Sequence, residues 1–428
     1  MADIIDFIAE LKFEKIPEKA VQIARLCLLD AVGCMAGGIH YPSVFNLAQT
    51  ISGNNPGSTA IVGTSLTTTR PWASFVNTHA CTFFDLDDGH RKAQGHPGGV
   101  IIPLSLMLAA ENGCSGKELL TAVVAGYETA VRSALIMRQA GGLRKGSGAW
   151  SVTGGIAAAG KLSNLKKPAL KNALGLAEYY APQAPQDRSL AFPSSMKEGL
   201  AWASHTAVTI VELASAGFDG MSPFLLDASQ CHDLGINWEI RSVYFKMYAC
   251  CRFSHPVLDG LTSLIREHGI LPDSIKSIKV ASFAKALLLG HIAPGNSVAA
   301  MYSIPYAVGC KLVKGEVGPR ELTTDSLTDK QILGIAEKVT IEEDPGITEL
   351  FPEKCLARIT LHLKNGTIIK SDTFSAKGDP DNPYTLDEIR SKFLNLSKSL
   401  AGNRNEKLYD LIMNIENENP RELWKMLH

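Results

Sequence analysis

The sequence lacks the short motifs that mark most cofactor and metal sites. Its 9 cysteines form no C-x-x-C pair, which argues against a zinc ribbon, a thioredoxin-type site and an iron–sulfur cluster. No G-x-x-x-x-G-K-[ST] motif occurs, and no G-x-G-x-x-G stands between a strand and a helix, so nucleotide binding has no positive support. We therefore expect no cofactor and no metal, and we expect most of the cysteines to be small buried hydrophobic residues.

Excess charge, a secretion signal and long apolar runs are also missing. Lys and Arg number 42 against 43 Asp and Glu, and no long basic run appears, so we expect no nucleic-acid partner. The first residues are acidic and do not resemble a signal peptide. Polar residues interrupt the apolar runs before the roughly 20 residues that a membrane span needs. These absences predict a cytoplasmic protein that does not enter the membrane.

What the chain does have is length and helical periodicity. Its 428 residues, 45% of them hydrophobic, allow a large core and about two domains. Ser115 and Glu118 have the spacing of a capping box at the start of a helix. Apolar residues recur with helical spacing through the first half and predict helices at 17–37, 70–83, 100–112, 115–137, 149–162, 168–178 and 197–216.

The pattern changes past about residue 240. Alternating apolar and polar residues predict strands at 275–280, 339–341 and 357–369, the last with an Asn-Gly turn. Helical patterns lie between the strands, at 255–268 and 298–314, and return after a linker at 378–383. The sequence therefore predicts an α+β two-domain fold, with a large all-α helical domain over 1–240, rejoined by 385–428, and a smaller α+β domain over 241–384.

The densest cluster of ionisable side chains lies at 85–91. Its carboxylates, Asp85, Asp87 and Asp88, repel one another, so at least one should titrate unusually unless cations or helix N-termini offset the charge. Other interpretations stay open on these residues alone. They are a solvated acidic helix terminus, an acid motif like that of class II terpene cyclases, and a divalent-metal site made of Asp87, Asp88 and His90.

Further candidates follow along the chain. His96 stands in Gly-His-Pro-Gly-Gly directly before an apolar helix, whose positive dipole end would keep the imidazole near neutral and able to act as a base. A second cluster at 246–256 contains Lys246, Arg252 and His255 and could bind carboxylates. Lys197 precedes one predicted helix and Tyr306 lies in another. Alone, each is typical of an ordinary surface lysine or core tyrosine.

Taken together, these segments resemble the MmgE/PrpD family along essentially the whole chain. Residues 77–88 and 96–99 look like the family's N-x(7)-D-[FL]-D-D and H-P-[SGA]-[GA] motifs. The segments 195–197, 246–256 and 303–308 are similar to its S/T-x-K, K-x-Y-x-x-C-x-x-x-H-P and S-x-P-Y-A-V motifs, and 378–393 is similar to its closing motif. The motifs also occur in the family's order.

The resemblance implies a site between the two domains, a homodimer, and cofactor-free chemistry on a small polycarboxylate substrate. We expect His96 to be the general base, oriented by Asp85 or Asp87, and Tyr306 or His90 to be the acid. Lys197 and the substrate-binding residues complete the expected site, the latter being Lys246, Arg91, Arg252, Asp87, Asp88, His255 and Lys145.

The chain departs from the family at a few positions. Gly89 stands where decarboxylase-like members carry Thr, and Thr82 stands where a His is common. Relatives also have a catalytic His in a G-[FW]-H-x-T segment. The matching stretch here is 144–150, with Lys145 or a gap at that position, and no His occurs from 97 to 204.

These departures leave the reaction open. We expect a lyase that eliminates like 2-methylcitrate dehydratase after proton abstraction next to a carboxylate. An epimerase like iminodisuccinate epimerase, or an inactive binder of acidic metabolites, is the alternative. A Lys145 that faces the cleft could replace the missing His, whereas one that points to solvent would favour the binder.

Overall fold

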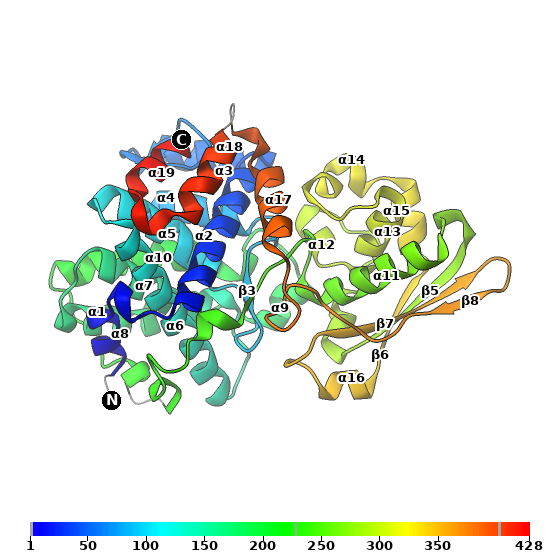
Figure 1. The fold of residues 1–428 in the computed structure, drawn as a ribbon, viewed down its shortest axis with the longest axis horizontal. Helices are drawn as coiled ribbons and strands as arrows, with labels where there is room; N and C mark the ends of the chain where they lie inside the picture. Colours follow the sequence, from blue (N-terminus) through cyan, green and yellow to red (C-terminus); the bar gives the residue numbers. More distant parts are fainter. Residues whose placement is uncertain (1–2, 227–228, 401–403) are drawn as a thin grey trace.

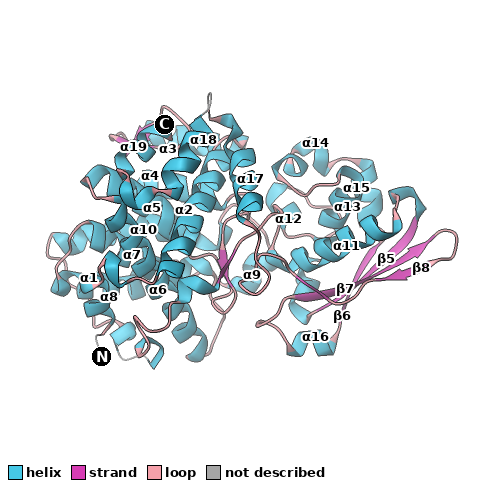
Figure 2. Cartoon of the chain, in the orientation of Figure 1, coloured by secondary structure: helices cyan, strands magenta, loops and turns pink. Residues whose placement is uncertain are grey.

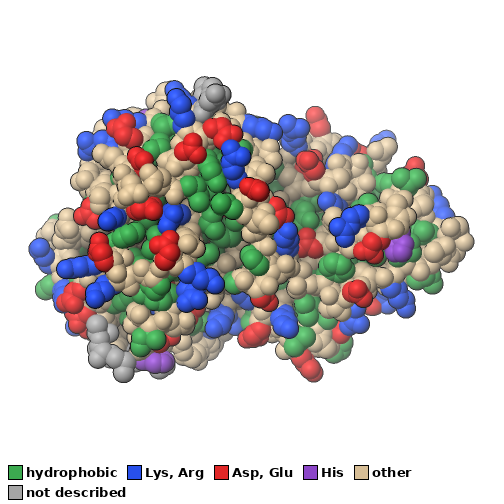
Figure 3. Space-filling view, viewed as in Figure 1, with side chains coloured by type: hydrophobic (Ala, Val, Ile, Leu, Met, Phe, Trp, Pro, Cys, Tyr) green, Lys and Arg blue, Asp and Glu red, His purple; other side chains and the backbone are tan. Residues whose placement is uncertain are grey.

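Two bodies of different composition lie side by side along the long axis of the molecule (Figure 1). This computed structural model describes residues 3–226, 229–400 and 404–428. The larger body is helical, and the long strands lie in the smaller one (Figure 2). Basic and acidic side chains are interspersed over the face in Figure 3, as the balanced composition leads one to expect. The fold is therefore broadly the predicted two-part α+β arrangement.

The larger body is a set of packed helices with a shared apolar core. The predicted capping box is present, because the Ser115 hydroxyl accepts from the Glu118 amide while the Glu118 carboxylate accepts from the Ser115 amide. A Cβ atom on Gly154 would lie 2.5 Å from the carbonyl oxygen of Gly126, so small residues let α6 and α7 approach closely. The helices are α1 (Ile4–Glu10), α2 (Glu18–Gly38), α3 (Pro42–Asn54), α4 (Arg70–Thr82), α5 (Gly98–Asn112), α6 (Gly116–Gln139), α7 (Ser147–Leu162), α8 (Lys167–Tyr180), α9 (Gln186–Ala191) and α10 (Leu200–Ser215).

Two of these helices correct the expectation that apolar runs are short. Helix α2 has 21 residues and α6 has 24, and both are long and apolar enough to cross a membrane. In this fold 72% of the most apolar window of α2 and 89% of that of α6 are buried inside the protein. Their apolar composition is therefore accounted for by the core of the larger body.

The chain returns to the larger body at its C-terminal end. Helices α17 (Leu386–Leu396), α18 (Arg404–Met413) and α19 (Pro420–Met426) lie on that body (Figure 1). Helices α17 and α18 pack against α2, and α19 packs against α5. Lys392 on α17 donates to Asp30 on α2 at 2.5 Å and to the carbonyl oxygen of Leu86 at 2.6 Å. Because Leu86 belongs to the acidic cluster at 85–91, the returning helix also supports that loop.

The smaller body is a five-stranded sheet covered by helices. Its strand order is β6-β5-β7-β8, with β9 also paired to β7, and only the β5–β6 pair is parallel. The strands are β5 (Ile275–Ser282), β6 (Val339–Glu343), β7 (Leu356–Leu363), β8 (Ile368–Lys370) and β9 (Phe374–Ser375). The helices are α11 (His255–His268), α12 (Ser297–Met301), α13 (Ile304–Lys314), α14 (Thr324–Leu327), α15 (Lys330–Ala336) and α16 (Pro345–Glu349).

Two predicted helices have different boundaries. The helix expected over 298–314 is two helices, because the Ser303 hydroxyl caps α13 by accepting from the Tyr306 amide. The helix expected from 197 begins at Leu200 instead. Lys197, Glu198 and Gly199 before it have φ values of 41°, 55° and 75°, in the left-handed region. Both changes reposition side chains of the candidate site.

Two short strand pairs complete the structure. Strands β1 (Thr59–Ala60) and β2 (Thr67–Thr68) pair within the larger body. Strands β3 (Gly89–His90) and β4 (Val243–Tyr244) pair antiparallel, with Gly89 opposite Tyr244. This second pair, which the sequence did not predict, joins the acidic cluster to the chain just before Lys246.

Candidate active site

Asp85 lies at the centre of a buried ion cluster. Its Oδ1 accepts from Lys197 Nζ at 2.9 Å and its Oδ2 from Lys246 Nζ at 2.5 Å. Burial raises the pKa of Asp85, but the charges of the two lysines outweigh it and hold that pKa well below the usual range. Burial likewise lowers the pKa of Lys246, but Asp85 and Asp87 raise it overall. Asp85 therefore stays ionised between two ammonium groups.

His96 is held by one ring nitrogen and presents the other. Its Nδ1 lies 2.8 Å from the carbonyl oxygen of Asp88 and 3.3 Å from Asp87 Oδ2. Its Nε2 lies 3.9 Å from Asp85 Oδ1. Since a backbone carbonyl only accepts, Nδ1 carries a hydrogen and Nε2 is the nitrogen available for proton transfer.

The charge state of His96 differs from the prediction. Burial lowers its pKa, but Asp87, by its charge and its hydrogen bond, raises the pKa to about 9 overall. The prediction of a neutral imidazole is therefore wrong, because a carboxylate at 3.3 Å outweighs the dipole of the following helix. At neutral pH His96 carries a proton on each nitrogen.

Asp88 is a carboxylate of the acidic cluster whose pKa lies above the usual value. It accepts from the Gly98 amide at 3.2 Å and from the Tyr127 hydroxyl. Burial, with the charges of Asp30 and Asp87, raises its pKa to about 7. Asp88 therefore fixes the start of α5 and does not line the cavity, so the structure does not give it the substrate contact that the sequence predicted.

His90 faces away from these carboxylates. Its Nδ1 accepts from the Ala93 amide at 3.2 Å and its Nε2 lies 3.4 Å from Glu239 Oε2. The described part of the chain holds no group of three or more His, Cys, Asp or Glu side chains placed to bind a metal ion. This arrangement gives no support to a metal site made of Asp87, Asp88 and His90.

A cavity lies between the two bodies and borders this cluster. Its volume is about 50 Å³, enough for a few water molecules. The larger body contributes Asp85, His90, Arg91, Gln94, Gly95, His96, Gln186, Leu190 and Glu198. The smaller body and the segment that leads into it contribute Tyr244, Cys251, Arg252, Phe253, Tyr302, Phe351 and Pro352. Lys197 and Lys246 lie directly behind Asp85, and Asp87 lies behind His96.

Two arginines form a second charged group on the cavity wall. Arg91 Nη2 donates to both oxygens of Asp379 at 2.7 Å, and Arg252 Nη2 lies 3.2 Å from Asp379 Oδ1. The ring of Tyr244 lies against both guanidinium groups, 5.0 Å from Arg91 and 4.5 Å from Arg252. Asp379 comes from the linker at 378–383, which the sequence did not connect with the site.

His255 supports Arg252 and does not reach the cavity. Its Nδ1 lies 3.4 Å from Arg252 Nη1, and its Nε2 lies 3.3 Å from the carbonyl oxygen of Cys250. Burial and the charges of Arg252 and Lys246 hold the pKa of His255 well below its usual value. A neutral His255 therefore orients Arg252, which corrects its predicted contact with substrate.

The cavity tyrosine is not the one that the sequence indicated. The Tyr306 hydroxyl donates to the carbonyl oxygen of Glu321 at 2.7 Å, and Tyr306 does not line the cavity. Tyr302 does, and Lys197 Nζ lies 5.3 Å from its ring centroid. Tyr306 was expected from the resemblance of 303–308 to the family motif, whereas Tyr302 lies at the break between α12 and α13, just before that motif.

Lys145 does not line the cavity. Its Nζ donates to Gln183 Oε1 at 2.7 Å, outside the cavity. Ser147, the first residue of α7, is the residue of this segment that contacts the site, because its Oγ accepts from the His96 amide at 3.0 Å. Its hydroxyl also donates to Glu198 at 2.7 Å. Ser147 and Glu198 were not expected in the site, because an isolated Ser and an isolated Glu form no recognisable catalytic motif.

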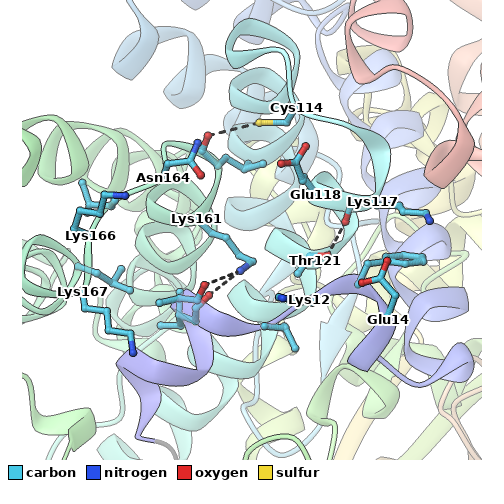
Figure 4. Close-up of a pocket in the computed structure, with 17 residues that line it drawn as sticks. Lys12, Glu14, Cys114, Lys117, Glu118, Thr121, Lys161, Asn164, Lys166 and Lys167 are labelled. Atoms are coloured by element: carbon cyan, nitrogen blue, oxygen red, sulfur yellow. Dashed lines mark hydrogen bonds between the residues drawn. The ribbon is translucent and has the colours of Figure 1, made fainter.

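A larger groove, of about 490 Å³, lies elsewhere on the helical body (Figure 4). Lysines line it, but they hold the N-terminal segment in place. Lys161 donates to the carbonyl oxygen of Ile8 at 2.9 Å, and Lys167 pairs with Asp6 at 2.6 Å and with Glu10. None of the predicted site residues lines this groove.

The two bodies, and the buried charges at the cavity between them, define a two-domain protein with a candidate active site where the domains meet. The chain belongs to the MmgE/PrpD family: the model of the family's N-terminal domain matches residues 2–232, and that of its C-terminal domain matches residues 248–417. The C-terminal match thus includes α17 and α18, which pack on the larger body.

Relatives named as cis-aconitate decarboxylase or as similar to it match nearly the whole chain. It is 23% identical over 459 residues to cis-aconitate decarboxylase of Aspergillus terreus (strain NIH 2624 / FGSC A1156), spanning 97% of this chain and 93% of that protein. It is 25% identical over 467 residues to cis-aconitate decarboxylase-like protein oryM of Aspergillus oryzae (strain ATCC 42149 / RIB 40), spanning 97% and 94%. These relatives support a lyase-type enzyme.

Proposed function

We propose that this protein is a cofactor-independent lyase that removes a proton next to a carboxylate of a small di- or tricarboxylate and then eliminates water, as 2-methylcitrate dehydratase does. One observation carries the proposal. Two carboxylates beside the cavity are each shared by two cations, the buried Asp85 by two lysines and the partly buried Asp379 by two arginines that line the cavity. Each group therefore keeps one unit of positive charge, which suits a substrate with at least two carboxylates.

The lysine group also suits the chemistry. When a proton leaves the carbon next to a carboxylate, negative charge develops on the carboxylate oxygens as an enediolate. Ammonium groups held by Asp85 and buried from water stabilise that charge strongly, because Lys197 is 5% and Lys246 0% exposed. The cavity of about 50 Å³ is smaller than any such substrate, so binding requires the two bodies to separate slightly.

Three other functions share parts of this site. Return of the proton to the opposite face, without loss of water, would make an epimerase. Lys145 lies away from the cavity, and a Lys145 that does not face the cleft favours an inactive binder. Decarboxylation, the reaction for which the relatives are named, would instead remove a carboxylate of the substrate as carbon dioxide.

Nuclear magnetic resonance in deuterated water separates these functions. The protein is incubated with citrate, 2-methylcitrate, malate and cis-aconitate in turn. An alkene signal, with deuterium next to a carboxylate, supports the lyase. Deuterium without elimination identifies an epimerase, and binding with neither signal identifies the binder. Loss of carbon dioxide, or failure to bind any of the acids, contradicts the proposal.

We also propose that the protein works in the cytoplasm as a homodimer. All 9 cysteines are free thiols, which fits a reducing compartment. The loop before α10 and the adjoining helices expose large apolar side chains. Phe192 is 69%, Met196 74% and Trp202 50% exposed. The Trp202 ring also packs 5.6 Å from the Trp72 ring. A second copy covering this face would bury it and support the loop that carries Lys197.

A further inference from the structure

The loop at Lys197-Glu198-Gly199 has an unusual backbone that places two charged side chains at the site. Its φ values are 41°, 55° and 75°. A side chain other than glycine in the left-handed region costs about 1 to 2 kcal/mol, so this conformation must be held by its surroundings. As a result, these consecutive side chains reach different parts of the site. Lys197 donates to Asp85, and Glu198 accepts from Ser147 at the start of α7.

The Glu198 carboxylate is fixed by one oxygen only. Its Oε2 accepts from the amide and from the hydroxyl of Ser147, each at 2.7 Å. The amide is one of those that a helix leaves without a partner in its first turn. Oε1 makes no hydrogen bond within the described part of the chain, and the side chain lines the cavity. Glu198 therefore offers a positioned and uncommitted oxygen.

Ser147 connects Glu198 to His96. Its Oγ accepts from the His96 amide at 3.0 Å while its hydroxyl donates to Glu198. The flanking glycines make room for this contact. A Cβ atom on Gly148 would lie 2.5 Å from the carbonyl oxygen of Glu198, and one on Gly146 would lie 3.0 Å from Glu198 Oε2. The segment at 144–150, where relatives carry a catalytic histidine, therefore packs closely around Glu198.

Glu198 also differs from the other carboxylates near the cavity. Asp85 binds two lysines, Asp379 binds two arginines, and Glu239 lies beside His90. Within the described residues Glu198 forms no ion pair with a cation, so no neighbouring side chain neutralises its charge. A carboxylate that accepts a proton needs such a free oxygen.

We propose that Glu198 is the proton acceptor of this active site and that His96 is the proton donor that works with it. The assignment rests on the proposed function and reverses the role first expected for His96. The groups that face this pair are Lys197 on the same loop, Asp85, Asp87 and Lys246 around His96, and Tyr302.

The reaction then proceeds in balanced steps. Glu198 Oε1 takes the proton from the carbon next to a substrate carboxylate, and the C–H electron pair moves into that carboxylate as an enediolate. The pair returns to form the C=C bond while the neighbouring C–O bond breaks. His96 Nε2 donates its proton to the departing hydroxyl, which leaves as water. Transfer of a proton from Glu198 to His96 through solvent restores both groups.

The test compares Glu198→Gln and Glu198→Asp with the wild-type protein. Glu198→Gln keeps the shape and the acceptor oxygen but cannot take a proton. We expect it to lower kcat and deuterium exchange by about 10²-fold or more, with KM changed by only a few fold. It should also remove the acid limb of the pH profile of kcat. Glu198→Asp should restore part of the rate together with that limb.

Ser147→Ala separates catalysis from positioning. It removes one anchor of Glu198 but keeps the carboxylate, so we expect a smaller loss of kcat with the acid limb retained. Thermal unfolding shows whether each variant folds. If Glu198→Gln does not fold, Glu198→Asp decides, because a kcat and a rate of deuterium exchange equal to those of the wild type would contradict the assignment.

Two negative results have different meanings. If the wild type catalyses exchange and Glu198→Gln retains it within about threefold, Glu198 is not the proton acceptor, and the proposed function stands. If the wild type catalyses neither elimination of water nor deuterium exchange with any of the four acids, the proposed function is wrong, and the assignment of Glu198 fails with it.

Discussion

At the scale of single residues, His96 carries the reactive nitrogen of the proposed site. Its Nδ1 is held by the Asp88 carbonyl oxygen, and Nε2 remains for proton transfer. We expect His96→Gln to lower kcat by about 10² to 10⁴-fold, the usual contribution of a positioned acid or base. Steady-state kinetics on the substrate found by deuterium exchange measure this, with His268→Gln, at the exposed end of α11, as the control. A rate close to that of the wild type would remove His96 from the mechanism.

The same residue predicts a pH dependence of stability. The folded protein raises the His96 pKa to about 9, above the ordinary value of 6.5. A raised pKa means that the folded state binds the proton more tightly, so the stabilisation is complete below about pH 6.5 and is lost as pH rises through 9. The full effect is of the order of 3 kcal/mol.

Urea unfolding of the wild type and of His96→Gln between pH 6 and 10 measures this contribution. The free energy of unfolding of the wild type should fall more steeply with pH than that of the variant. The pKa of Asp88, raised to about 7, gives a slope of its own at lower pH, and the variant shares it. Parallel curves for the two proteins would contradict the charge state assigned to His96.

Sequence reasoning identified many of the side chains that the structure brings together. Asp85, His96, Lys197 and Lys246 were expected in one site, and the other three side chains each lie beside Asp85. Tyr302 and Glu198 were missed, because each depends on a backbone break that has no sequence signature. The charge of His96 was also missed, since the distance to Asp87 is a tertiary fact.

At the scale of elements, the contact between the start of α7 and the loop before α10 makes a stability prediction. A Cβ atom on Gly148 would lie 2.5 Å and 2.7 Å from backbone atoms of Glu198 and Gly199. Since backbone atoms cannot turn aside as a side chain does, we expect Gly148→Ala to destabilise the protein by about 1 to 3 kcal/mol.

Gly53 on α3 is the matched control for this substitution. A Cβ atom there would meet nothing within 4 Å, and the position is helical. Gly53→Ala should therefore leave the free energy of unfolding unchanged or raise it by up to about 1 kcal/mol. Urea unfolding of both variants checks the pair. Equal effects would show that the two segments do not pack as described.

Local sequence signals were sufficient for most of the regular elements. The capping box at Thr385 and Glu388 is present, and the strands expected at 275–280 and 339–341 lie within β5 and β6. The errors fell where a local rule competes with tertiary contacts. The pairing of β3 with β4 joins segments that are far apart in the chain and only two residues long, too short for any pattern.

At the scale of the whole molecule, the exposed apolar face predicts the oligomeric state. Trp202 lies at its centre, beside Trp72, Phe75 and His205. We expect Trp202→Glu to convert a dimer to a monomer, because an interface does not bury an unpaired carboxylate without a penalty of several kcal/mol. Light scattering coupled to size-exclusion chromatography measures the mass.

Ile236→Glu is the control, since Ile236 is 78% exposed and lies outside this face. It should remain a dimer. A wild type that elutes as a monomer at all concentrations tested would contradict the homodimer. A Trp202→Glu variant that stays dimeric would instead move the interface to another face.

The sequence by itself determined the two-part helical and α+β organisation, because periodicity and capping act over a few residues and are written in the order of the chain. Its separated motifs also indicated the family to which the chain belongs. Only the tertiary structure decided which charges meet. Asp379 joins the arginines, Glu198 reaches the start of α7, and His96 holds a proton beside Asp87, since each of these depends on distances between segments remote in the chain.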